Sequence, residues 1–203
     1  MQPIMINNMK KYVFLFFMAF VTLAINAQKK TWELDTNHAS LGFVVTHLGV
    51  SEVDGYFNNF DIKLSATDES FSDAVVELTA HVKSVDTDNR RRDDHLRSAD
   101  FFDAAKYPKL TFKSKSVKKT GDKKFKVSGD LTMHGVTRQV DVNVVLNAVV
   151  DNTWSKQRVA GFRASSTIKR SDFGVGTGPA AATVGDEVKI VANLEFTRTL
   201  DNK

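Results

Sequence analysis

Apolar and polar residues alternate along most of this chain after residue 30, and that pattern limits the folds it can adopt. Between 140 and 148 the even positions are Val140, Val142, Val144, Leu146 and Ala148, with mainly aspartate and asparagine at the odd ones. A period of two is typical of a β-strand with one buried face and one wet face. Comparable patterns cover 31–47, 52–64, 73–85, 112–131, 158–169 and 188–196.

Turn signals separate these stretches, among them Asp54-Gly55, Thr120-Gly121-Asp122 and His134-Gly135. The chain therefore predicts about eight antiparallel strands at regular intervals. A closed barrel is favoured over a flat sheet, because closure removes exposed strand edges. The predicted fold class is all-β, a single eight-stranded antiparallel barrel with one helical insert. Such a barrel is filled by side chains or has room for one small ligand.

The N-terminus has the composition of a secretory signal. Two lysines, Lys10 and Lys11, precede an apolar run over 12–25, and Asn26-Ala27-Gln28 follows. Basic, apolar and small residues in this order predict a signal peptide over 1–27, cut after Ala27. The run is too short for a comfortable membrane span, so we expect no stable membrane anchor.

Two consequences follow for location and organisation. We expect a periplasmic or secreted protein with one domain over 28–203. Met9 is a more natural start than Met1, because it places the lysines at the N-terminus, and both starts stay open.

The sequence has no cysteine, so an exported chain must rely on burial and strand pairing. It also has no cysteine to carry a lipid anchor.

The charge argues against nucleic acid as a partner. The formal net charge is +4, and removing Lys10 and Lys11 leaves +2. Seven lysines do cluster between 113 and 126, but they flank Thr120-Gly121-Asp122. A solvated hairpin explains them better than a nucleic-acid surface does.

One segment, 90–108, departs from the strand pattern. It is rich in charge, contains Phe101 and Phe102, and ends in Tyr107-Pro108. A helix near 88–104 is predicted, with Asp88 as its N-cap and Pro108 bounding it. Asp93 and Arg97 are expected to pair at i, i+4.

Two interpretations of this segment remain open. In the first, Leu96, Ala99 and Phe102 pack onto the barrel end and the charges are solvated. In the second, the segment is a lid, whose aromatic residues line a pocket mouth and whose arginines face an anionic or polar headgroup.

Several motifs resemble those of the YceI-like family of exported proteins. The matching stretches lie in order over 32–198 and include His38 with Phe43 and His47, Val53 to Phe57, Arg92 to Leu96, Phe101 to Asp103, Tyr107 to Phe112, Gly129 to Arg138 and Arg170 to Gly174. The resemblance implies a lipocalin-like barrel whose apolar cavity binds a polyisoprenoid or another long-chain amphiphile. It implies no catalysis, and suggests isoprenoid carriage or a role in stress response.

The candidate ligand-binding residues come from the inward strand faces and the lid. The apolar candidates are Phe43, Val45, Phe57, Phe60, Phe101, Phe102, Phe112 and Leu131, and the polar candidates at the mouth are His47, Arg92 and His95. A shift of one residue in a strand would reverse its two faces.

Other functions are less well supported. The histidines form no short His-x-His or His-x-x-x-His pair, so no metal is expected. His95 with a nearby aspartate lacks a nucleophile motif, so we expect neither an enzyme nor a cofactor. The glycines of 174–178 have no helix after them and are read as a flexible loop near the barrel mouth. A filled barrel that acts as an interaction or stress-protection module is the alternative function. A homodimer stays open.

Overall fold

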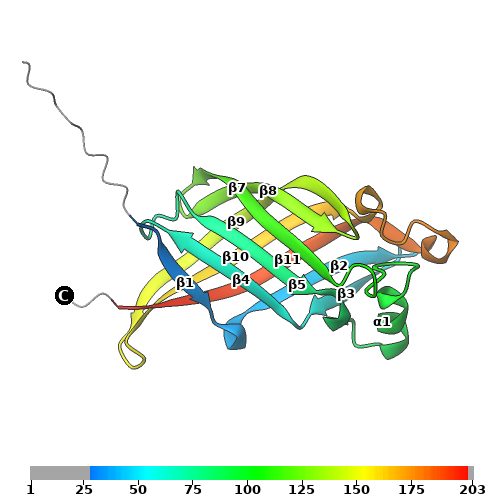
Figure 1. Ribbon diagram of the computed structural model, residues 1–203, viewed down its shortest axis with the longest axis horizontal. Helices are drawn as coiled ribbons and strands as arrows, with labels where there is room; N and C mark the ends of the chain where they lie inside the picture. Colours follow the sequence, from blue (N-terminus) through cyan, green and yellow to red (C-terminus); the bar gives the residue numbers. More distant parts are fainter. Residues whose placement is uncertain (1–27, 201–203) are drawn as a thin grey trace, which may run out of the picture.

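A computed structural model describes residues 28–200, and the predicted signal peptide lies outside them. The described chain is almost entirely β-structure (Figure 1). Its strands are β1 (Lys30–Leu34), β2 (Ser40–His47), β3 (Ser51–Phe57), β4 (Phe60–Ala66), β5 (Val75–His81), β6 (Val85–Asp86), β7 (Lys109–Gly121), β8 (Lys124–Met133), β9 (Val136–Asn152), β10 (Gln157–Lys169) and β11 (Val184–Thr199). The helix α1 (Arg90–Arg97) and four 3-10 turns, η1 (Thr36–His38), η2 (Val82–Ser84), η3 (Arg170–Phe173) and η4 (Pro179–Ala181), complete it.

The strands form one closed antiparallel barrel. Going round it, β1, β4, β5, β7, β8, β9, β10 and β11 pair in turn, and β11 pairs with β1 to close the ring. The short strands β2, β3 and β6 continue β1, β4 and β5 toward α1, since β2 pairs with the first part of β11. The predicted eight-stranded antiparallel barrel is therefore confirmed.

Three predicted strands are interrupted, which the alternation did not reveal. The stretch 31–47 breaks at Asp35, whose carboxylate accepts a hydrogen bond from the main-chain N of Asn37 at 2.9 Å and starts η1. The stretch 52–64 breaks at residues 58–59, and 73–85 breaks at η2. His38 therefore lies in η1, and His47 lies at the end of β2.

The helix is shorter than predicted and starts one residue later. Asn89 is the N-cap, and its side-chain oxygen accepts a hydrogen bond from the Arg92 N at 3.1 Å. Asp88, the expected N-cap, has a φ of 58° and lies outside the helix. The helix ends at Arg97, where the Ser98 hydroxyl donates to the His95 carbonyl. No helix among residues 28–200 has the length and apolar character to cross a membrane.

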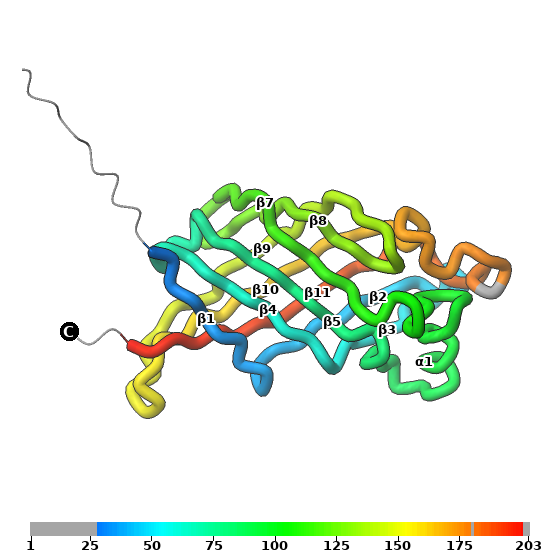
Figure 2. Tube along the Cα trace, in the orientation of Figure 1, coloured from blue at the N-terminus to red at the C-terminus, as the bar shows by residue number. Residues whose placement is uncertain are grey.

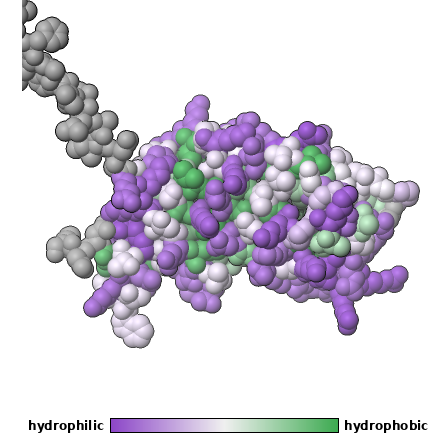
Figure 3. Space-filling model, in the orientation of Figure 1, coloured by the Kyte–Doolittle hydropathy of each residue, from purple (hydrophilic) through white to green (hydrophobic). Residues whose placement is uncertain are grey.

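The two ends of the barrel differ. The lid end carries α1, the β2–β3 turn and the segment 170–183, whereas the remote end carries the β4–β5 loop and the β9–β10 turn (Figure 2). Strands β7 and β8 form the predicted hairpin, with most of its lysines exposed. The face shown in Figure 3 is mostly polar, with some apolar side chains visible among the polar ones. The buried apolar side chains form two clusters, one toward each end.

Candidate ligand-binding tunnel

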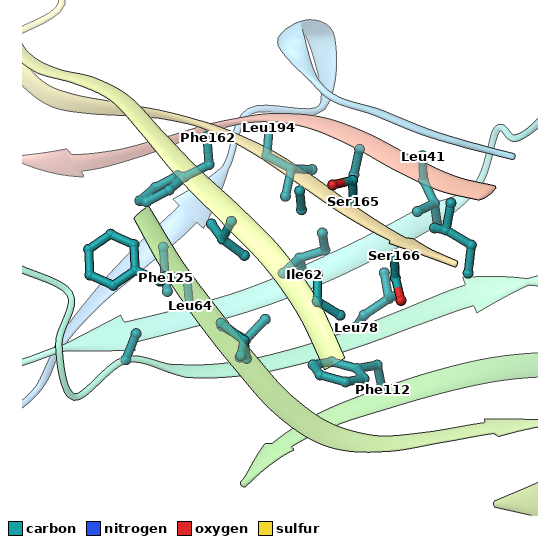
Figure 4. Close-up of a pocket in the computed structure, with 18 of the residues that line it drawn as sticks. Leu41, Ile62, Leu64, Leu78, Phe112, Phe125, Phe162, Ser165, Ser166 and Leu194 are labelled. Atoms are coloured by element: carbon teal, nitrogen blue, oxygen red, sulfur yellow. The ribbon is translucent and has the colours of Figure 1, made fainter. Parts of the chain in front are cut away.

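Two apolar chambers lie in series inside the barrel. The deep chamber, of about 150 Å³, reaches toward the remote end, and the lid chamber, of about 110 Å³, lies beneath α1. Figure 4 shows how aliphatic and aromatic side chains from several strands surround the deep chamber. The chambers adjoin, because five residues line both: Leu41, Leu78, Leu131, Ile168 and Ile190. We refer to the pair as the tunnel.

Strand periodicity produces the apolar wall. On β10 the even-numbered residues from Phe162 to Ile168 line the tunnel, and on β11 those from Val188 to Phe196 do so. Successive side chains of a strand point to opposite faces, so the even-numbered set faces inward, with Ser165 as the one odd-numbered residue of these two strands at the wall. The hydroxyls in the wall belong to Ser165 and Ser166, and the Ser166 hydroxyl donates to the Asp141 carbonyl at 2.8 Å. The wall therefore suits an alkyl or prenyl chain.

Arg170 is the one charged residue among those that line the tunnel, and it lies at the lid chamber. Its Nε donates to the Gly185 carbonyl at 2.9 Å, and its Nη1 to the carbonyls of Val175, at 3.0 Å, and Gly176. Its Nη2 donates to the carbonyls of Ala181 and Val184, the latter at 2.9 Å. All these acceptors are neutral carbonyls, and the charge of Arg170 also interacts with the nearby Asp186 carboxylate. A positive charge thus lies beside an apolar space.

The sequence of the barrel matches a known family. Residues 32–196 match the model of the YceI-like domain. The chain belongs to the YceI-like family. Protein YceI of Escherichia coli O157:H7 is 41% identical over 160 residues, which cover 78% of this chain and 81% of that protein.

Solved structures of related proteins have the same fold. The crystal structure of Burkholderia cenocepacia BcnA superposes with a TM-score of 0.72 at 28% identity, covering 80% of this chain and 99% of that one. A domain from Saccharophagus degradans, described as polyisoprenoid binding, superposes with a TM-score of 0.61 at 17% identity. It covers 81% of this chain and 97% of the domain, and at that identity it shows the shared fold alone.

Seven of the sequence-predicted ligand residues line the tunnel of this YceI-like barrel. Five lie at the lid chamber, one at the deep chamber, and one lines both; in that order they are Phe43, Val45, Phe57, Phe101, Phe102, Phe112 and Leu131. The structure therefore brings strand and lid candidates together. Their contact with a ligand stays a prediction.

The other four candidates lie outside the tunnel wall. Phe60 lines a separate hollow beside Asn58 and Asn59, where the chain breaks between β3 and β4, and it also packs against both buried clusters. His47 is the last residue of β2 and pairs with Ser51 at the rim. Contacts of these two residues with a ligand stay untested.

Arg92 and Asp93 attach α1 to the barrel. The Arg92 Nε donates to the Thr87 hydroxyl at 2.7 Å, and its Nη2 donates to the Thr87 carbonyl at 2.7 Å. Asp93 is 5% exposed and accepts hydrogen bonds from Thr87. The expected pair of Asp93 with Arg97 is wrong, because Arg97 pairs with Asp94 at 3.0 Å instead.

His95 lies on the outer side of the lid. Its ring packs edge-on against Phe101 with centroids 4.9 Å apart, and its Nε2 lies 3.0 Å from an Asp100 carboxylate oxygen. Phe101 lines the lid chamber and His95 does not, so His95 contacts the tunnel only through the Phe101 ring.

Arg170 donates to two carbonyls of the segment 174–178, which was expected to be a flexible loop near the barrel mouth. Gly174 and Gly176 have φ of 70° and 60°, which only glycine adopts without strain. A side chain at Gly176 would lie 2.7 Å from the Phe101 ring. The segment therefore packs tightly onto the lid at the barrel end.

Sequence reasoning missed several wall residues. Phe162 and Phe196 lie on predicted strands, and their even positions in the alternation could have identified them. Arg170 is part of a recognised family motif, but its position at the tunnel was not predicted. Phe71 lies in a loop, where no periodicity operates.

One cluster among the described residues has the composition of a metal site. The ligand atoms of Asp35, His38 and Glu195 lie within 4.8 Å of one another. The Asp35 carboxylate lies 2.9 Å from the His38 Nδ1, and this hydrogen bond raises the pKa of His38 and lowers that of Asp35. The interaction explains the cluster as a surface ion pair.

Proposed function

We propose that this YceI-like protein is an exported, non-catalytic carrier that holds one polyisoprenoid or similar long-chain amphiphile in its tunnel, with a role in stress response. The observation that carries the proposal is the tunnel itself, two adjoining chambers with an almost wholly apolar wall. The polyisoprenoid-binding description of the Saccharophagus degradans domain supports the choice of ligand. Open space inside the barrel favours a carrier over the filled interaction module.

The chamber volumes indicate how the tunnel would accept a chain. An apolar cavity of about 150 Å³ stays dry and binds a molecule the size of benzene. Two such chambers in series, of about 150 and 110 Å³, fit a narrow and elongated apolar chain better than a compact ligand. A long prenyl chain requires lining side chains to rotate, and covering it contributes about 25 cal/mol per Å² of apolar area.

The charge of Arg170 gives the ligand a direction. Its guanidinium lies at the lid chamber, whereas the deep chamber is lined by no charged residue. All five N–H groups of Arg170 already donate to main-chain carbonyls, so the attraction comes from its charge alone. That charge would place an anionic headgroup at the lid, and the apolar tail would extend toward the remote end. A prenyl phosphate should consequently bind more tightly than the prenyl alcohol of equal length.

Native mass spectrometry and solvent extraction of freshly purified protein test the proposal. We expect one long-chain molecule per protein, and the emptied protein should bind geranylgeraniol. Ala164→Phe, which places a ring in the deep chamber, should abolish binding. Ala148→Phe is the matched control, because Ala148 is exposed on β9. Failure of the emptied wild type to bind prenyl alcohols, prenyl phosphates and fatty acids would refute the carrier function.

Export needs a separate test. N-terminal sequencing of the mature protein from its native host should begin at Gln28. A mature chain that retains 12–25 would contradict the signal peptide.

A further inference from the structure

Phe71 lines the deep chamber at the remote end of the barrel. It is the one aromatic residue of the β4–β5 loop, residues 67–74, and it is 3% exposed. Its ring lines the deep chamber, with its centroid 4.9 Å from that of Phe162 and 5.3 Å from that of Trp32. Phe196 lies beyond Phe162 and lines the same chamber. We call Phe71, Phe162 and Phe196 the floor of the tunnel, with Trp32 packed behind Phe71. Phe71 alone among the three comes from a loop.

The loop holds Phe71 in a conformation that a bulky residue rarely adopts. The φ of Phe71 is 53°, in the left-handed region. Such a backbone persists where the surrounding contacts enforce it, and it is often found at ligand sites. The inward position of the ring is therefore imposed by the loop.

Polar contacts on both sides of Phe71 fix the loop. The Asp73 carboxylate accepts hydrogen bonds from the Thr67 hydroxyl at 2.6 Å and from the Thr67 N at 3.1 Å. The Glu69 carboxylate accepts two hydrogen bonds from Arg158, at 2.9 and 2.6 Å, and one from Arg198 at 3.1 Å. Arg198 also lies over the Trp32 ring, so the loop and the floor are tied together.

We propose that Phe71 limits the length of the chain that the tunnel accepts, with the apolar tail ending against its ring. This inference rests on the proposed carrier function and on the headgroup lying at the lid. Side-wall residues can rotate aside for a passing chain, but the floor lies across the path of its end. The chain length at which affinity stops rising should therefore depend on Phe71.

The test uses prenyl alcohols of increasing length, from geraniol through farnesol and geranylgeraniol to longer members. Each methylene covered changes the Kd by about fourfold. In the wild type, affinity should rise with length and then level off. Phe71→Ala should move that limit to longer chains, improving the Kd of the first chain beyond the wild-type limit by about tenfold or more.

Phe112→Ala is the matched control, since Phe112 lines the same chamber at its side. Phe112 pairs across strands with Leu78 and Leu131, which line both chambers, so it lies midway along the tunnel. Its removal should change affinity at every length and leave the limit unchanged. Phe71→Leu, a smaller change, gives the same test should Phe71→Ala fail to fold.

A second measurement needs no change at Phe71. Trp32 and Trp154 are the two tryptophans of the chain, so Trp154→Phe leaves Trp32, directly behind Phe71, as the sole reporter. Alkanols with bromine at the far end should quench Trp32 fluorescence once the bound chain is long enough to reach the floor.

The outcomes separate this inference from the proposed function. Three results would overturn the role of Phe71 and leave the carrier function standing. They are a chain-length limit that is unchanged in the Phe71 variants, affinity that rises without limit in the wild type, and bound chains that never quench Trp32. Absence of any binding by the wild type would refute the carrier function and the length limit with it.

Discussion

The side chain of Asp93 accepts two hydrogen bonds from Thr87, one from the main-chain N at 2.9 Å and one from the hydroxyl at 2.6 Å. These are the two buried polar or charged residues within the described part of the chain, at 5% and 6% exposure. The same hydroxyl accepts a hydrogen bond from the Arg92 Nε, so the first turn of α1 is attached to the end of β6. The charged motif at the start of the helix thus positions the lid.

Asp93→Ala should loosen the lid. The change leaves two buried donors of Thr87 without an acceptor, and we expect a loss of about 1–3 kcal/mol in unfolding free energy. Asp94→Ala is the matched control, because Asp94 pairs with Arg97 at an exposed site and such pairs contribute about 0.2–1 kcal/mol. Urea unfolding and amide hydrogen exchange over residues 90–97 measure both. Equal losses in the two variants would contradict the positioning role of Asp93.

Glu69→Gln should reduce stability in a pH-dependent way. The hydrogen bonds from Arg158 hold the pKa of Glu69 below its usual range, so its ionised form favours the folded state. Its contribution is therefore present at neutral pH and is lost as the pH falls below about 4, through the lowered pKa. Glu69 is 34% exposed, so solvent screening limits the effect to roughly 1 kcal/mol or less.

Urea midpoints of wild type and Glu69→Gln across this pH range check that prediction. The difference in urea midpoint between the wild type and Glu69→Gln should disappear in acid. Glu77→Gln serves as the control, since Glu77 pairs with Lys113 at 3.7 Å on the strand surface. A gap that stays constant into acid would show that the charge of Glu69 does not act on the loop.

Arg170→Ala should release the segment over the barrel end. It removes hydrogen bonds from a charged donor to several carbonyls, and we expect a loss of roughly 2–3 kcal/mol. The segment 174–185 should also become susceptible to protease. Arg163→Ala, at an exposed site on β10, the strand that leads into η3, should change stability by no more than about 0.5 kcal/mol. Unchanged protease resistance in Arg170→Ala would show that the segment is held by other contacts.

Gly129→Ala should destabilise the barrel. A Cβ at Gly129 would lie 2.3 Å from the Lys113 carbonyl oxygen and 2.6 Å from the Phe112 ring, and the backbone cannot yield easily. Overpacking of this kind costs about 1–3 kcal/mol. Gly178→Ala is the control, because nothing lies within 4 Å of its added Cβ. Thermal unfolding of both variants measures the difference, and a Gly129→Ala protein as stable as the control would contradict the close approach.

The strand alternation predicted the closed barrel and most of its apolar wall. Residues such as Phe43, Phe112 and Leu131 face inward because successive residues of a strand point to opposite sides. Alternation is a local property, so it is visible in a single sequence. Phe60 lies outside the tunnel wall because the chain breaks beside it, at a point where the alternation does not reveal the change of geometry.

The charged segment shows a second limit of the sequence. Its helix and its place at the barrel were predictable, whereas the burial of Asp93 was not. A carboxylate is normally solvated, and only the donors of Thr87 make its burial favourable. Those donors belong to a different element, so their meeting depends on the folded chain.

The sequence by itself determined the periodicity of two, and with it the strands, the closed barrel and the apolar character of its interior. Only the tertiary structure decided where the tunnel ends, because Phe71 and Arg170 reach it from segments without periodicity. Their positions depend on partners distant in sequence, such as Arg158 for the Phe71 loop and Gly185 for Arg170. Barrel closure brings these partners together.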